Sequence, residues 1–316
     1  MKRSIVWATV FLLACAGVSW ACSICKCGDH SFFINSARLL PSGRMILSFE
    51  HLNLSKSSAH VDPEGGHGDE HGLLKAAGPR SIQHASGTAT QVQNTVQASL
   101  FYGLSNRFMV TATVPYVFNQ MTFVGETEKA DGFGDPEVTA LVSVLPNTMG
   151  RINLQAVAGA RMPLGKSELT NDHGDLLDPH IQAGSGAWAG SFGLQAMLAN
   201  GSLPLFASAG YQVNGTNDQN FAYGDVWRYN FAAQKTLGKL FDLIGEINGR
   251  YAQYDQESGE NDPNSGGSVV YVSPGLRLRM FSALSLRAQV QIPVIEELHG
   301  VQDEDVNFRT GLIWER

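Results

Sequence analysis

Apolar and polar residues alternate over most of the sequence after residue 43. In the segment 284–293 one set of alternating positions is apolar and the other polar: Leu284, Leu286, Ala288, Val290 and Ile292 against Ser285, Arg287, Gln289 and Gln291. Segments 90–102, 225–236 and 267–280 divide in the same way. A period of two residues is typical of β-strands with one apolar and one polar face. The pattern therefore predicts an all-β protein.

The alternating segments predict about twelve strands and two kinds of connector. The strands are expected at 44–54, 88–103, 108–119, 135–146, 151–163, 186–200, 203–215, 225–236, 241–254, 267–280, 284–295 and 305–314. Short turns alternate with long connectors at 55–87, 120–134, 164–185, 216–224, 255–266 and 296–304. Long strands with short periplasmic turns and long extracellular loops are typical of antiparallel transmembrane β-barrels. A secreted β-sandwich is the alternative, and it would scatter long loops between both ends.

The N-terminus has the features of an export signal. A basic start, Met1–Arg3, precedes an apolar run at 5–18, and the small residues Ser19 and Ala21 fit a signal-peptidase site. The apolar run is shorter than the roughly 20 residues of a membrane-spanning helix. We expect a signal peptide at 1–21, a periplasmic segment at 22–43 and a barrel at 44–316. Lipoprotein processing at Cys15 is the alternative, because Leu12–Cys15 resembles a lipobox.

Composition narrows the class of protein further. Only 16% of the residues are charged, 43% are hydrophobic and 34 are glycine, which excludes a disordered chain and a coiled coil. The net charge of −7 argues against nucleic acid as a partner. No phosphate-binding loop or catalytic pair stands out, so we expect no enzyme. His173 and His180 share a long loop with several aspartates, and a polar external loop is the preferred interpretation over an acid–base site.

The polar faces of the predicted strands carry many charged residues. A charge facing lipid costs about 2–4 kcal/mol at mid-membrane, so these residues are expected to face the lumen. They are Glu50, Arg228, Asp242, Glu246, Arg250, Arg277, Arg279, Arg287 and Arg309. One interpretation is a basic wall that selects anions or dipolar solutes. The other is that arginines and carboxylates on neighbouring strands pair and fill a narrow lumen.

Two segments contain possible metal ligands. Cys22, Cys25, Cys27 and His30 open the expected mature chain and could hold Zn²⁺ or Cu(I). A disulfide between two of the three cysteines, or lipidation of Cys22, is the alternative. The long connector 55–87 contains His60, His67 and His71 among carboxylates, a weak metal signal beside the alternative of a solvated loop.

Several strand junctions are similar to those of one known family. They are Tyr102–Phe108, Val114–Tyr116, Gly132–Asp135, Gly159–Gly165 and Ala207–Tyr211. These segments resemble the outer-membrane β-barrel transporters named for the meta pathway of phenol degradation, over most of residues 90–314. The resemblance implies an outer-membrane channel, often linked to small aromatic or apolar compounds. Such barrels usually end on an aromatic residue that the barrel-assembly machinery reads, whereas Trp314 is followed here by Glu315 and Arg316.

Together these observations predict a channel or porin-like transporter that passes small solutes, including aromatic compounds or metal ions, across the outer membrane of a Gram-negative-type bacterium. Its expected partners are outer-membrane lipid, the barrel-assembly machinery and a small-molecule solute. The alternative function is metal binding by the cysteine segment and the histidine-rich loop, with the barrel as an anchor. An outer-membrane esterase is disfavoured, because no Ser/His pairing stands out.

Overall fold

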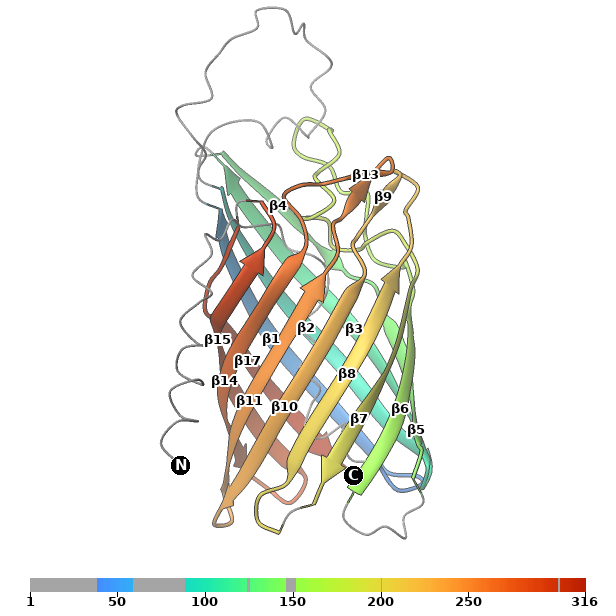
Figure 1. The fold of residues 1–316 in the computed structure, drawn as a ribbon, viewed down its shortest axis with the longest axis vertical. Helices are drawn as coiled ribbons and strands as arrows, with labels where there is room; N and C mark the ends of the chain where they lie inside the picture. The colour runs from blue at the N-terminus through green and yellow to red at the C-terminus, as the bar shows by residue number, and fades with distance from the viewer. Residues whose placement is uncertain (1–38, 59–88, 124–125, 146–151, 200, 301) are drawn as a thin grey trace, which may run out of the picture.

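The computed structural model describes residues 39–58, 89–123, 126–145, 152–199, 201–300 and 302–316, which form a closed antiparallel β-barrel (Figure 1). The wall has twelve strand positions, as predicted. They are β1 (Met45–Ser58), β2 (Ala89–Ser105), β3 (Phe108–Phe123), β5 (Glu137–Ser143), β6 (Ile152–Arg161), β7 (Ala189–Leu198), β8 (Leu205–Asn214), β10 (Val226–Leu237), β11 (Phe241–Ala252), β14 (Gly267–Arg279), β15 (Leu284–Leu298) and β17 (Asn307–Glu315). No helix among the described residues is long and apolar enough to span a membrane.

The barrel closes because β1 pairs with strands at both ends of the sheet. Phe49 of β1 lies opposite Ala98 of β2 on one side and Leu312 of β17 on the other. The backbones of Met45 and Arg316 exchange two hydrogen bonds of 2.9 Å below this ladder. Glu315 therefore lies within the last strand, opposite Ile46. Closure removes the unpaired edges that an open sheet would expose.

Alternation along each strand separates an apolar outer face from a mostly polar inner face. Large apolar side chains project outward from every part of the wall, including Phe49, Leu100, Val114, Phe231, Leu243 and Leu276. Buried polar residues point inward from the neighbouring positions, including Ser48, Thr95, Gln155, Gln195, Asn248 and Gln291. The apolar exterior is the surface that lipid requires.

One prediction about the long loops was wrong. Most of 120–134 is strand and not loop, because β3 continues to Phe123 and pairs with β4 (Glu126–Phe133). Tyr116 donates a 2.8 Å hydrogen bond to Asp131, and the hydroxyls of Thr122 and Thr127 lie 3.0 Å apart. These cross-strand contacts extend the hairpin beyond β5. The two strands β4 and β5 occupy one position in the wall, beside β3.

Three of the other long connectors contain short strands among the described residues. Three short strands, β9 (Phe221–Ala222), β12 (Gln256–Glu257) and β13 (Glu260–Asn261), form a small separate sheet at the long-loop end. β16 (Asp303–Glu304) pairs with the end of β1. These connectors lie at the upper end of the barrel in Figure 1.

The short-turn end of the lumen is apolar. Leu39, which precedes the first strand, packs inside the barrel against inward side chains: Ile46, Phe101, Met109, Leu141, Val157 and Ile313. A second apolar cluster lies on the wall formed by β8, β10 and β11, where Phe206, Ala232 and Ile244 are buried. We call these two clusters the floor. Part of the expected periplasmic segment 22–43 therefore enters the barrel.

Candidate functional site: the barrel lumen

The lumen has a charged wall, which we define as β1, β11, β14, β15 and β17. At its centre Arg309 of β17 binds Glu50 of β1 with an Nη2–Oε2 distance of 2.9 Å. Both side chains are buried, and Gln97 of β2 donates a further 3.0 Å hydrogen bond to the same carboxylate oxygen. Because β1 and β17 close the barrel, this ion pair bridges the closure.

A second buried network lies on the same wall. Glu246 of β11 lies 3.3 Å from Arg287 of β15 and accepts a 2.6 Å hydrogen bond from Gln289. Asn230 of β10 also donates to Glu246. Side chains of β11 and β15 are therefore joined over β14, which lies between these strands, and β10 is joined to them through Asn230.

Near the long-loop end Glu304 gathers three partners. Lys56 of β1 and Arg250 of β11 form ion pairs with it, and the Tyr271 hydroxyl of β14 donates to it. Glu304 is 5% exposed and lies on β16. The sequence placed it in the connector 296–304, so its role was missed. The two-residue strand that contains Glu304 is too short to show the alternation of apolar and polar residues that marks a strand.

The remaining predicted arginines lie on the inner face with partners of their own. Arg277 contacts Glu315 at 2.9 Å, and Arg279 contacts Asp242 at 3.2 Å. Arg228 donates to Gln212 at 3.0 Å. Arg250, Arg277, Arg279, Arg287 and Arg309 therefore each have a carboxylate partner. The geometry resembles the paired, lumen-filling alternative more than an uncompensated basic stripe.

The opposite part of the lumen, the strands β5 to β8, has small and uncharged side chains beside the charged Glu137 and Arg161, and we call it the neutral wall. Gln195 donates a 2.7 Å hydrogen bond to Gln155 across the β6–β7 ladder. Glycines at 193 and 210 face each other on β7 and β8. A cavity of about 50 Å³ lies here, and we call it the hollow. Its lining is Glu137, Thr139, Val157, Ser191, Phe192, Gly193, Gly210, Tyr211 and Arg228.

The segment 162–188, which joins β6 to β7, folds over the mouth of the barrel. Inward side chains of β2 and β3 hold it: Gln91 donates to the His180 carbonyl at 3.3 Å and Asn119 to the Ile181 carbonyl at 2.8 Å. Leu177 and Ile181 pack with Ala130 of β4. We call this segment, with 215–225, 253–266, 299–300 and 302–306, the roof.

The base of the roof is formed by two of the sequence motifs described above, 132–135 and 159–165. Asp135 accepts hydrogen bonds from the backbone of Gly165 at 3.0 Å and of Ser185 at 2.7 Å. A side chain at Gly165 would lie 2.6 Å from the backbone of Gly134, and one at Gly184 would lie 2.6 Å from that of Gly165. Only glycine fits such close backbone approaches. The motifs at 132–135 and 159–165 therefore meet where the roof leaves the wall.

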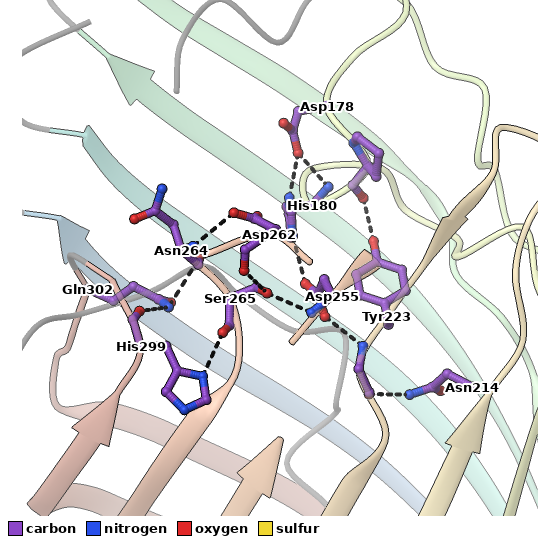
Figure 2. Close-up of polar contacts among 12 residues, drawn as sticks. Asp178, His180, Asn214, Tyr223, Asp255, Asp262, Asn264, Ser265, His299 and Gln302 are labelled. Atoms are coloured by element: carbon purple, nitrogen blue, oxygen red, sulfur yellow. Dashed lines mark hydrogen bonds and ion pairs between the residues drawn. The ribbon is translucent and has the colours of Figure 1, made fainter. Parts of the chain in front are cut away.

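His180 connects the roof segments to one another (Figure 2). Its Nδ1 lies 2.7 Å from Asp178 and its Nε2 lies 2.9 Å from Asp255 of the segment 253–266. Tyr223 of 215–225 donates to the Pro179 carbonyl at 2.5 Å. The network continues through Ser265, whose carbonyl lies 3.0 Å from His299 Nδ1. One buried imidazole thus links segments that are far apart in the sequence.

Charge explains the protonation of this group. Burial by itself lowers the pKa of His180, but the adjacent Asp178 and Asp255 carboxylates outweigh it and raise that pKa well above its ordinary value. Burial raises the pKa of Asp262, which lies in the same network. No acid–base site on a substrate is implied, because both ring nitrogens of His180 already face protein carboxylates.

The predicted metal ligands lie outside the described residues. These are Cys22, Cys25, Cys27, His30, His60, His67 and His71. Within the described ranges no group of three or more His, Cys, Asp or Glu side chains is arranged to hold a metal ion. Zinc or copper binding by these segments therefore stays a prediction. The same holds for the signal peptide at 1–21.

Comparison with known proteins places the fold and the family. The solved COG4313 outer membrane channel from Pseudomonas putida F1 is similar, with a TM-score of 0.64, 12% identity, and coverage of 89% of this chain and 98% of that chain. The β domain of the Bordetella autotransporter BrkA has a TM-score of 0.51 at 8% identity, with 87% and 100% covered. At these identities the matches show the outer-membrane barrel fold.

The sequence itself has no significant match among curated proteins. A family model, described as "Putative MetA-pathway of phenol degradation", matches residues 74–296. This range covers more than half of the chain and contains every motif from which the resemblance was inferred. The chain therefore belongs to that family of outer-membrane β-barrels.

Proposed function

We propose that this protein is an outer-membrane channel for small uncharged solutes, with phenol-like aromatic compounds as the candidate class. The main observation behind this proposal is that carboxylates in the lumen form ion pairs with arginines. Glu50, Glu246 and Glu304 each lie against an arginine, so the inner surface offers little net field to attract an ion. A neutral solute pays no comparable penalty for leaving water.

The neutral wall supports this solute class. Its amide and hydroxyl groups can exchange hydrogen bonds with a single solute hydroxyl, and Val157 gives the hollow beside them an apolar contact. Below it, the floor presents Phe206 and Ile244, which suit an aromatic or aliphatic body. The family description names phenol degradation, and phenol combines one hydroxyl with one apolar ring.

The test is transport by the refolded mature protein in lipid vesicles. We expect phenol to enter protein-containing vesicles faster than protein-free ones, after correction for its diffusion through lipid, while steady ion conductance in planar bilayers stays low. A more polar neutral solute of similar size, such as a small polyol, diffuses little through lipid. Its entry therefore serves as a comparison that needs no such correction. A large, steady, anion-selective conductance would instead favour the arginine-governed pore.

A matched pair of variants connects transport to the hollow. Ser191→Leu fills the hollow from β7, whereas Ala209→Leu adds the same apolar bulk on the outer face of β8. If the solute passes along the neutral wall, the first variant reduces entry and the second does not. Equal entry through both variants would contradict this route.

A further inference from the structure

The geometry around His180 requires a charged ring. Both nitrogens lie within hydrogen-bond distance of carboxylate oxygens, 2.7 Å to Asp178 and 2.9 Å to Asp255. A carboxylate only accepts hydrogen bonds, so both nitrogens must carry a proton, which makes the ring an imidazolium. A neutral ring would direct a lone pair at one carboxylate.

The partners of this imidazolium are fixed to different parts of the roof. Asp255 also accepts a 2.7 Å hydrogen bond from the Gly224 amide, and its own amide donates to Ser265 at 2.6 Å. Asp178 belongs to the segment 162–188, as His180 does. The His180–Asp255 contact is therefore a direct side-chain link between the segment over the mouth and the segment 253–266 (Figure 2).

The other groups near His180 do not replace its charge. Phe221 and Tyr223 present ring edges, with centroids 5.3 and 6.0 Å from the imidazole. Gln91 of β2 and Asn119 of β3 are neutral and bind only backbone carbonyls. Asp262 of 253–266 interacts with His180 and Glu128 of β4 interacts with Asp178, and both are acidic. Loss of the imidazolium charge would therefore leave these carboxylates without the positive charge of His180.

We propose that the His180 imidazolium, held between Asp178 and Asp255, is the latch of the roof, and that loss of its charge releases the residues between Gly165 and Ser185 from the mouth of the barrel. That this release opens a path for solutes rests on the proposed channel function. The release of the segment is independent of that function. The Asp135 junction stays closed in this motion, because its hydrogen bonds join Asp135 to Gly165 and Ser185 and do not involve His180.

The direction of the pH dependence follows from the raised pKa of His180. A histidine whose folded pKa exceeds its unfolded value stabilises the folded arrangement fully below the unfolded pKa. This contribution is lost as the pH rises through the folded pKa. The latch is therefore expected to hold at neutral pH and to release in alkaline solution.

The first experiment measures hydrogen exchange of the segment 177–184 in the refolded full-length protein. His180→Gln and Asp255→Asn are compared with wild type and with His173→Gln, which changes an exposed histidine of the same segment. We expect exchange about 100-fold faster in the first two at neutral pH, as for removal of one partner of a buried ion pair, and no change in the control. Heat-modifiable migration on gels confirms that each barrel is folded.

The second experiment removes the charge of His180 by a change of pH. Wild-type protein is titrated from neutral to alkaline pH, and exchange of 177–184 is expressed relative to His180→Gln at each pH, so that the base-catalysed rise in intrinsic exchange cancels. If His180→Gln does not fold, the same titration is done on wild type and His173→Gln. In each protein, exchange of 177–184 is then expressed relative to exchange of a strand segment. Convergence of wild type with His180→Gln in alkaline solution supports the latch.

Solute entry is measured on the same samples. Release of 177–184 without entry of any solute supports the latch and overturns the proposed channel. Entry that rises with pH while the segment stays protected overturns the latch and leaves the channel intact. Equal protection in folded wild type, His180→Gln and Asp255→Asn also overturns the latch.

Discussion

The charged wall and the neutral wall of the barrel have the same backbone ladder but use their inward positions differently. On the charged wall long side chains meet over the inner face of neighbouring strands and neutralise one another, as Arg287 and Glu246 do. On the neutral wall glycine and serine leave the hollow beside the strands. The difference teaches that charge in this lumen mainly fills space and holds strands together, whereas the absence of side chains creates room for a solute.

The largest effect on the difference between the two walls is expected when a buried cation is removed from the charged wall. Arg309→Met leaves Glu50 buried without its arginine, so we expect a loss of about 3–5 kcal/mol in unfolding free energy. Denaturant unfolding in lipid vesicles measures it. The double variant Glu50→Gln/Arg309→Met is expected to recover most of the loss, and a double variant as unstable as the single one would contradict the explanation.

A smaller effect is expected on the neutral wall, on transport and not on stability. Ser191→Leu should reduce entry of a neutral aromatic solute about tenfold, which corresponds to about 1.4 kcal/mol at a binding step. Its unfolding free energy should stay close to that of Ala209→Leu. A Ser191→Leu barrel that loses stability and keeps its transport would reverse the roles assigned to the two walls.

The smallest effect is expected at the short-turn end of the charged wall. Glu315 pairs with Arg277, but its side chain is 41% exposed. Water screens this ion pair, so Glu315→Gln should cost less than about 1 kcal/mol in the same unfolding measurement. A loss as large as that of Arg309→Met would show that burial does not set the strength of these pairs.

Periodicity predicted the barrel because a strand that separates lipid from lumen must alternate. Segment 284–293 became part of β15, and Arg287 and Gln289 face inward from it. Alternation also marked Glu50 and Arg309 as inward residues, although it did not show that they meet. Their contact joins residues 259 positions apart and depends on closure of the ring.

The roof could not be predicted in the same way. His180 was recognised only as a polar loop residue, because its partner Asp255 lies 75 positions away in another connector. Glu304 was missed for a related reason, since β16 is too short to show a period. Irregular segments carry no repeating pattern, and their contacts become visible only when the wall places them together.

The contacts of the roof also set an order of events in folding. His180 and Ile181 bind the inner faces of β2 and β3, while Asp255 follows β11, so the roof needs strands from both halves of the chain. Contacts of such high sequence separation form late, because loop-closure entropy opposes them until nearby strands have paired. Formation of the His180–Asp255 contact would therefore report that the ring has already closed, and it offers a late marker for following assembly of the barrel in time.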